Sequence, residues 1–416
     1  MRFSALDDWL RWLEGLHPRA IDLGLERVRE VAARMGLQPG DAVVITVGGT
    51  NGKGSSVAML DAILRADGRT TGCYTSPHLH RFNERIRIDG VDADDASIMA
   101  AFAAVDAARG ETTLSYFEFG TLAAMWLFAR ERVDVWLLEV GLGGRLDAVN
   151  IIDADVALLT SIGIDHVDYL GQTRAAIALE KVAIGRPGRP LVCGERRPPR
   201  TLLEFVVERD IDLRLAGRDF DRRADASGWR WWFGSMTLED LPFPALAGEH
   251  QLDNAAAVLT ALAVSPLPTS REAVVAGLKT VTLAGRFERI DAGFDVVLDV
   301  THNPHGMARL AAMLAARPVP GRDLILFGVM ADKDLPGVVA ALAPLGADWF
   351  AAAPAVERAL PASALAAALE GQGGTVVGWG SVADGVALAR RRLGVGDRLI
   401  VTGSFHTVAE ARELFI

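Results

Sequence analysis

The segment Val43–Ser56, VVITVGGTNGKGSS, predicts a phosphate-binding loop between a buried strand and a helix that begins near Lys53. Four glycines in the turn let the backbone bend so that several N–H groups point at one spot. A helix N-terminus behind that spot attracts anions, and Lys53 adds a positive charge. The hydroxyl of Ser55 or Ser56 can ligate a magnesium ion that bridges phosphates. The segment therefore predicts binding of a nucleoside triphosphate.

This loop departs from the common P-loop at one position. The usual form places Ser or Thr directly after the lysine, whereas Gly54 intervenes here. A glycine turn without any ligand is the alternative, since such turns often follow strands. The combined order of strand, glycines, lysine, hydroxyl and helix favours the nucleotide.

The bulk composition favours a two-domain enzyme. The chain has 416 residues, of which 50% are hydrophobic and 23% charged, and its net charge is −10. An acidic chain lacks the basic face that nucleic acid requires. Two cysteines, Cys73 and Cys193, are too few for a disulfide framework or a zinc cluster and are expected in the core. No signal peptide or apolar run of membrane-spanning length is present, so a soluble cytoplasmic protein is expected.

Strand-like runs alternate with amphipathic helical stretches, which is typical of an α/β fold with mainly parallel sheets. Strands are expected at 42–47, 133–140, 156–161 and 191–193 in a first domain, and at 295–300, 323–329, 348–352, 375–378 and 398–402 in a second. Residues 1–281 are predicted to form the first domain, 282–288 a linker, and 289–416 a second, smaller α/β domain. A hairpin with clustered tryptophans is expected at 228–238, where aromatic pairing across strands is favoured over a stacking platform for a ligand.

Several polar residues follow expected strands, where open α/β sheets bind ligands. Glu139 ends an apolar strand and is interpreted as a ligand for a hard cation, with a salt bridge to Arg145 as the alternative. Ser76 lies in a proline-fixed turn that could present its hydroxyl to a metal or be a simple turn. His166 is a weak metal candidate, because magnesium prefers oxygen ligands.

Three further residues are ambiguous from their local sequence. Lys181 lies in an ordinary amphipathic pattern at a helix end. Arg286 and Asp299 could clamp phosphates and ribose, respectively. Helix capping by Asp299 or Asn303 is the alternative for the second motif.

Eleven motifs in this order resemble the folylpolyglutamate synthase and dihydrofolate synthase family of the Mur ligase superfamily. They are IDLGLERV, GGTNGKGSS, TSPHL, YFEFGTLAAMW, LEVGLGGRLDAVN, DHVDYLG, GEHQLDNAA, AGRFERI, LDVTHNP, GVMADKD and TGSFHTV. The resemblance runs nearly end to end. One departure is Ala183, which stands where the family usually has glycine.

The resemblance implies that residues 1–281 form an ATPase and folate-binding domain with a P-loop-type mononucleotide-binding sheet, and that residues 289–416 form a Rossmann-like α/β domain. It also implies a set of ligands and site residues. ATP would contact Thr50, Asn51, Gly52, Lys53, Gly54, Ser55, Asn254, Arg286 and Asp299. Magnesium, as two ions, would be held by Ser76, Glu139 and His166. The pterin or pteroate group would contact Ile21, Asp22, Leu23, Ser115, Tyr116, Phe117, Glu118, Leu146, Asp147 and Ala148. Lys53, His166 and Lys181 would be catalytic, Lys181 as a carbamate, and the resemblance also allows for a monovalent cation.

The implied reaction is ATP-dependent amide formation by a monomeric enzyme. A substrate carboxylate attacks the γ-phosphate to give an acyl phosphate and ADP, and the amine of L-glutamate then displaces phosphate. The implied acids are dihydropteroate and reduced folates. The alternatives are a folylpolyglutamate synthase alone, a Mur-type ligase for UDP-sugar acids, and a non-catalytic ATP-binding module.

Overall fold

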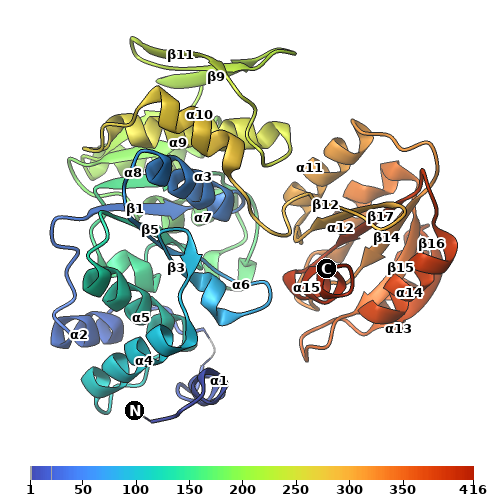
Figure 1. Cartoon of the computed structure of the whole chain (residues 1–416), viewed down its shortest axis with the longest axis horizontal. Coiled ribbons are helices and arrows are strands. Elements are labelled where there is room, and N and C mark those ends of the chain that lie inside the picture. The colour runs from blue at the N-terminus through green and yellow to red at the C-terminus, as the bar shows by residue number, and fades with distance from the viewer. Residues whose placement is uncertain (1, 20) are drawn as a thin grey trace. The chain divides into compact units, whose positions relative to one another are not determined.

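Two compact units make up the chain, and each has its own sheet (Figure 1). A computed structural model describes residues 2–19 and 21–416. The first unit comprises Met1–Ala245 and Glu249–Thr282, and the second comprises Leu246–Gly248 and Leu283–Ile416. Residues 283–288 of the expected linker belong to the second unit, and Glu288 begins a strand. Nothing in the sequence had indicated that Leu246–Gly248 join that unit.

The first unit contains an eight-stranded sheet with the order β4-β3-β2-β5-β1-β6-β7-β8. The six strands β2, β5, β1, β6, β7 and β8 pair in parallel with their neighbours. At one edge, β3 pairs antiparallel with β2 and β4 pairs antiparallel with β3. In that spatial order the strands are Val91–Asp92, Ile86–Ile88, Thr71–Tyr74, Val135–Glu139, Val43–Gly48, Val156–Leu159, Pro190–Cys193 and Asp212–Leu215. The central strands are buried continuous apolar runs, as parallel sheets covered on both faces require.

Helices cover both faces of this sheet (Figure 1). One face carries α3 (Lys53–Ala66), α9 (Glu249–Val264) and α10 (Arg271–Thr280), and α3 packs against both of the others. The other face carries a single apolar core built from the sheet and six helices. These are α1 (Leu6–Glu14), α2 (Glu26–Arg34), α4 (Asp95–Arg109), α5 (Tyr116–Glu131), α7 (Arg174–Val182) and α8 (Arg200–Glu208). Short helices η1 (Phe82–Arg85), η2 (Ala148–Ile151) and α6 (Val167–Leu170) lie in the connections.

The tryptophan hairpin is part of a three-stranded antiparallel sheet, β11-β10-β9, at Met236–Leu241, Trp229–Phe233 and Phe220–Ala224. The expected aromatic pairing of its tryptophans is wrong. Trp229 and Trp231 lie opposite Leu241 and Leu238, and both are buried. The Trp231 indole N–H donates to Thr260 Oγ1 at 3.0 Å, so this side chain anchors the small sheet on α9.

The second unit has a six-stranded sheet with the order β12-β13-β17-β14-β15-β16. Its strands, in that order, are Glu288–Asp291, Asp295–Asp299, Arg398–Thr402, Asp323–Phe327, Asp348–Ala353 and Thr375–Ser381, and only β12 pairs antiparallel. A core on one face includes α11 (Pro304–Ala315), α12 (Leu335–Leu342), which runs into η3 (Ala343–Leu345), and α13 (Ala362–Gly371). Helices α14 (Val382–Arg392) and α15 (Phe405–Glu413) pack against each other. The predicted α/β class is confirmed in both units.

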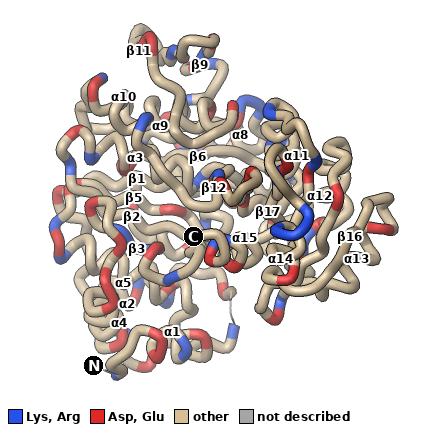
Figure 2. The backbone as a smooth tube through the Cα atoms, turned by 45° about the vertical axis from the view of Figure 1, so that its right-hand side comes forward, with Lys and Arg blue, Asp and Glu red and all other residues tan. Residues whose placement is uncertain are grey.

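Charged residues of both signs are interspersed along the backbone (Figure 2). Both cysteines are buried and unpaired, as expected for core residues. Among residues 2–19 and 21–416, no helix is long and apolar enough to cross a membrane.

Candidate active site

The loop between β1 and α3 is held by backbone groups and short hydroxyl side chains. The backbone N–H of Thr50 donates to Ser161 O at 2.8 Å, and its hydroxyl donates to Gly163 O at 3.1 Å. Thr160 Oγ1 donates to Asn51 O at 2.8 Å. Gly49 has φ +143°, and a Cβ placed on it would lie 1.9 Å from Thr160 Oγ1. Only glycine therefore allows the loop to lie this close to the end of β6.

Two lysines meet at one carbonyl of this loop. Lys53 Nζ donates to Gly49 O at 3.1 Å and to Thr50 O at 3.3 Å, and the buried Lys181 Nζ donates to Gly49 O at 3.0 Å. Burial, together with the nearby charge of Lys53, lowers the pKa of Lys181 to about 7, although Asp165 and Asp147 oppose the shift. A large fraction of Lys181 is therefore a neutral amine near neutral pH.

Ser55 and Asn254 are joined by a residue that sequence reasoning missed. Gln251, three positions before Asn254 on α9, donates to Ser55 Oγ at 3.3 Å and accepts from Asn254 Nδ2 at 2.9 Å. All three side chains are buried. Asn254 also lies beside Gly52, whose φ is +94°. The two residues are so close that a Cβ on Gly52 would lie only 2.7 Å from Asn254 Oδ1. The structure thus brings the predicted Asn254 to the glycine loop, where Gly54 occupies the first turn of α3.

Two of the predicted metal ligands are neighbours at the carboxyl edge of the sheet. Glu139 ends β5 and is buried, and its Oε2 accepts the backbone N–H of Ser76 at 3.2 Å. The alternative partner Arg145 instead pairs with Glu180 at 2.9 Å. The proposed salt bridge between Glu139 and Arg145 is therefore wrong.

The third predicted ligand, His166, has a left-handed backbone with φ +50° and an exposed side chain. It directly precedes α6, and its Nε2 lies 4.0 Å from Asp165 Oδ1. No group of three or more His, Cys, Asp or Glu side chains in the described ranges is placed to hold a metal. A set made of Ser76, Glu139 and His166 contains only two such side chains, so its role as a metal site stays a prediction.

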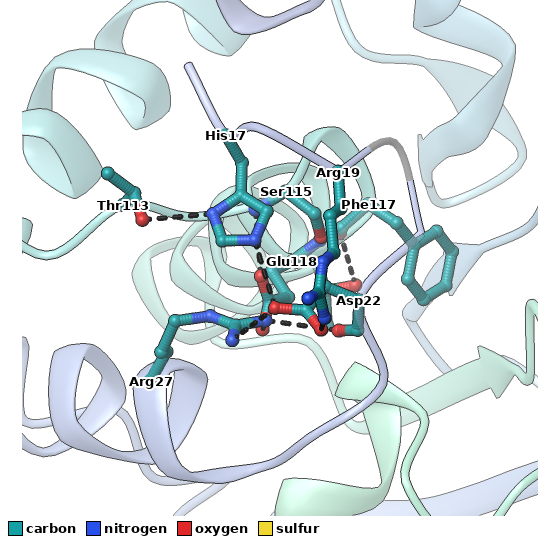
Figure 3. A network of polar contacts seen from close by, with 9 residues as sticks. His17, Arg19, Asp22, Arg27, Thr113, Ser115, Phe117 and Glu118 are labelled. Atoms are coloured by element: carbon teal, nitrogen blue, oxygen red, sulfur yellow. Dashed lines mark hydrogen bonds and ion pairs between the residues drawn. The ribbon is translucent and has the colours of Figure 1, made fainter.

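Two predicted pterin contacts, Asp22 before α2 and Glu118 in the first turn of α5, are linked by the side chain of Arg27 on α2 (Figure 3). Arg27 donates to Asp22 Oδ2 at 2.7 Å, to Asp22 O at 3.0 Å and to Glu118 Oε1 at 3.0 Å. His17 lies 3.0 Å from Asp22 Oδ2 and 2.9 Å from Thr113 Oγ1. The hydrogen bond from His17, with opposition from burial and help from the arginine charges, lowers the pKa of Asp22. Ile21 is exposed and Leu23 is half-buried beside this network.

The start of α5 is capped by its own sequence. Ser115 Oγ accepts the N–H of Glu118 at 3.3 Å, and Glu118 Oε2 accepts the N–H of Ser115 at 2.7 Å, which is a capping box. Glu118 is buried, whereas Tyr116 and Phe117 are half-buried. The ring centroids of Phe117 and Tyr74 lie 5.7 Å apart.

Asp147 is a buried carboxyl between Leu146 and Ala148. It accepts the N–H groups of Leu142 at 2.8 Å and Val149 at 3.1 Å. Burial raises its pKa to about 6, although these backbone donors and Lys53 oppose the shift.

The second unit contains Arg286 and Asp299. Asp299, at the end of β13, accepts the N–H groups of Phe287 and Thr301, each at 3.0 Å. Asn303 caps α11 through Gly306 N at 2.9 Å, so helix capping holds for Asn303 and not for Asp299. The guanidinium of Arg286 lies 5.1 Å from the ring centroid of Phe405.

Arg27 and Gln251 were not predicted as site residues, and the reason is the same for both. Arg27 is basic on a helix whose apolar face is buried, and Gln251 is a polar residue in an alanine-rich helix. Each is at a position where solvent exposure was the simpler expectation. Their partners, Glu118 and Ser55, lie 91 and 196 positions away in the chain.

Family models match about half of the first unit and most of the second. A model described as "Mur ligase middle domain" matches residues 47–189, and one described as "Mur ligase, glutamate ligase domain" matches residues 285–405. The chain is 41% identical over 411 residues to dihydrofolate synthase/folylpolyglutamate synthase of Escherichia coli strain K12, with 99% of this chain and 96% of the relative covered. The enzyme of that name from Haemophilus influenzae is 39% identical over 429 residues, covering 98% and 97% of the two chains.

Solved structures agree with this relationship. E. coli FolC in complex with DHPP and ADP superposes with a TM-score of 0.94 and 42% identity, covering 99% of this chain and 97% of that one. The Yersinia pestis bifunctional folylpolyglutamate synthase/dihydrofolate synthase complexed with AMPPNP and Mn ion has a TM-score of 0.92 and 40% identity, with 99% and 98% covered. The chain therefore belongs to the dihydrofolate synthase/folylpolyglutamate synthase family of ATP-dependent ligases, within the Mur ligase superfamily.

Proposed function

We propose that this protein adds L-glutamate both to dihydropteroate and to reduced folates through an acyl phosphate. The observation that carries the proposal is one edge of the sheet, where the glycine loop follows β1, Glu139 ends the adjacent parallel strand β5, and Lys53 and Lys181 both donate to Gly49 O. A phosphate-binding loop there suits ATP, and the nearby carboxyl edge of β5 suits a divalent cation. Family membership supports the same reaction and sets aside the UDP-sugar and non-catalytic alternatives.

The proposed ATP contacts are Thr50 to Ser55 with Asn254, and Arg286 and Asp299 of the second unit. Lys53 would neutralise phosphate charge, because its Nζ already lies at the loop rather than in solvent. Gln251 would act indirectly by orienting Ser55 and Asn254. ATP is a substrate of the reaction, and transfer of its γ-phosphate activates the carboxylate of the acid.

The residues at the edge of β5 fit a divalent cation. Glu139 offers a buried carboxylate, and Ser76 adjoins it through a backbone hydrogen bond. We propose Ser76, Glu139 and His166 as the ligands; a bound cation supplies charge neutralisation on the polyphosphate.

Glu139→Gln tests this assignment. The change keeps the shape and removes the charge, so we expect magnesium-dependent phosphate release to fall by about 100-fold or more, with an almost unchanged melting temperature. Asp134→Asn, which alters the carboxylate at the opposite end of β5, is the matched control and should keep its magnesium dependence. Lower thermal stability with substantial activity at saturating magnesium would remove Glu139 from the metal site.

The acid substrates would lie against Ile21–Leu23, Ser115–Glu118 and Leu146–Ala148. The supporting observation is that Arg27 joins the first two segments and that Asp147 is a buried carboxyl with a raised pKa. Phosphate release with ATP and L-glutamate should be measured with dihydropteroate and with tetrahydrofolate separately. Release with tetrahydrofolate alone would leave a plain folylpolyglutamate synthase.

We also propose that Lys181 is carbamylated. The neutral amine adds CO₂, losing a proton, and gives an anionic carbamate oxygen donor suited to a second magnesium ion. The lowered pKa and burial of Lys181 support this step. Incubation with ¹³CO₂ should give a carbamate carbon signal that Lys181→Ala lacks, and short carboxylic acids should partly restore the activity of Lys181→Ala. A monovalent cation, a monomeric state and a cytoplasmic location stay predictions.

A further inference from the structure

Arg85 is held by aromatic rings and a histidine at the end of η1. Its guanidinium carbon lies 5.6 Å from the ring centroid of Phe82 and 5.4 Å from that of Tyr116. Its Nε donates to His78 Nδ1 at 2.8 Å. Because Nδ1 accepts this bond, His78 is in its neutral form with the proton on Nε2. These contacts fix the plane of the guanidinium without using its two terminal nitrogens.

Arg81 and Arg27 each have a carboxylate partner, whereas Arg85 has none among the described residues. Arg81 pairs with Asp95 at 2.8 Å, and Arg27 pairs with Glu118 at 3.0 Å. Within residues 2–19 and 21–416, Arg85 forms no ion pair, and its terminal nitrogens have no hydrogen-bond acceptor. The adjacent Glu84 is occupied, because it accepts the N–H groups of residues 79–81. Arg85 therefore presents an oriented positive fork that no carboxylate of the described chain neutralises.

The position of Arg85 connects two parts of the candidate site. Tyr116, which stacks on it, belongs to the proposed pterin-binding segment at the start of α5. His78, its hydrogen-bond partner, follows the proposed metal ligand Ser76 by two positions. A ligand carboxylate there would meet an arginine whose rotamers are already restricted, which lowers the entropic cost of binding.

We propose that Arg85 is a substrate-binding residue whose terminal nitrogens bind a carboxylate of an acidic substrate. The inference rests on the proposed function, since dihydropteroate, reduced folates and L-glutamate all carry carboxylates. Arginine binds a carboxylate through two parallel hydrogen bonds, which a lysine does not reproduce. The rings of Phe82 and Tyr116 hold the Arg85 guanidinium in place, and the carboxylate of the bound substrate supplies the negative charge that pairs with it.

The test compares Arg85→Gln and Arg85→Lys with Arg81→Gln. The last change removes the same charge from the same loop, but at an exposed arginine that already has a partner. Steady-state phosphate release gives KM for ATP, L-glutamate, dihydropteroate and tetrahydrofolate, and melting temperatures report folding. We expect Arg85→Gln to raise KM for the bound acid by about tenfold or more, and Arg85→Lys by less, with KM for ATP unchanged. Arg81→Gln should leave every KM close to the wild-type value.

The separate substrates identify the carboxylate. A rise confined to KM for dihydropteroate and tetrahydrofolate assigns Arg85 to the pterin acid, and a rise confined to L-glutamate assigns it to the amino acid. A further measurement uses the carboxamide analogue of dihydropteroate as a competitive inhibitor, whose affinity should not change in Arg85→Gln if Arg85 binds the pterin carboxylate. Unchanged KM values, or equal changes in Arg81→Gln, would overturn the inference. Absence of turnover by the wild-type protein with every acid would instead refute the proposed function.

Discussion

The glycine loop Gly49–Lys53 and the segment formed by residues 17–19 and 21–27 belong to the same unit but are held in different ways. Backbone groups and short hydroxyl side chains fasten the loop to the end of β6. Long charged side chains fasten the segment, because Arg27 and His17 both contact Asp22. Contacts of the first kind depend on close approach, and those of the second kind depend on charge. The loop should therefore be sensitive to added volume, and the segment to lost charge.

The largest effect is expected from Gly49→Ala. A Cβ would overlap Thr160 Oγ1, and φ +143° is unfavourable for alanine, so the loop should lose about 4 kcal/mol. Calorimetric titration with MgADP should show a large loss of affinity, and the melting temperature should fall. Gly68→Ala is the control, since Gly68 also has a positive φ but nothing lies within 4 Å of the added Cβ. Wild-type MgADP affinity in Gly49→Ala would show that close approach does not hold this loop.

Arg27→Met tests the segment that is held by charge. Removing the guanidinium leaves the buried Glu118 without its ion-pair partner, so we expect a loss of about 3 kcal/mol in the free energy of unfolding. Adding Glu118→Gln should recover part of that loss, which a double-mutant cycle in urea measures. Arg34→Met, about two turns along the same helix, removes contacts with exposed Glu30 and with residues 108–112. Equal costs for Arg27→Met and Arg34→Met would contradict a special role for the Glu118 pair.

Lys181 is a titratable side chain at the loop that backbone groups otherwise hold, because its Nζ donates to Gly49 O. It therefore tests whether the loop also depends on charge. Its pKa is about 7 when folded and ordinarily 10.5, so between these values the unfolded chain binds more protons at this group. Its contribution therefore makes the free energy of unfolding rise with pH, by about 2 kcal/mol from pH 7 to pH 9. Urea denaturation of nucleotide-free, CO₂-depleted protein should show that Lys181→Met lacks this rise. The exposed Lys279→Met should retain the wild-type slope, and the same slope in Lys181→Met would place its folded pKa near the ordinary value.

The smallest effect is expected from Arg145→Gln. Arg145 and Glu180 form a pair in which the arginine is exposed, so its loss should cost no more than about 1 kcal/mol. The expected cost should shrink further at 0.5 M salt, because exposed charges are screened. A cost as large as that of Arg27→Met would mean that burial does not separate the two kinds of ion pair.

Much of the fold could be predicted, because buried parallel strands appear in the sequence as short runs of apolar residues. Strand β17 has the predicted bounds, Arg398–Thr402, whereas β5 is shorter at each end than the predicted 133–140. Just before β5 begins, the Asp134 side chain accepts hydrogen bonds from the N–H and the hydroxyl of Thr70. The glycine loop was equally readable, since its residues are contiguous in the chain.

Contacts between distant segments could not be predicted from local patterns. Nothing near Arg27 indicates Glu118, and nothing near Gln251 indicates Ser55, because the tertiary fold alone brings them together. The tryptophans of β10 illustrate the same limit, since their side chains pack on residues outside the hairpin. The individual roles of the predicted site residues stay predictions that the proposed variants address.

The short stretch Leu246–Gly248 has a consequence for exchanging parts between related ligases. Leu246 is buried and Ala247 packs against the core of the second unit, yet both precede α9 of the first unit. A chimera joined once, between Thr282 and Leu283, would combine a foreign second unit with two native apolar side chains selected for another core. Recombination within the superfamily therefore has to match two places in the gene, and a successful graft should carry Leu246–Gly248 together with residues 283–416.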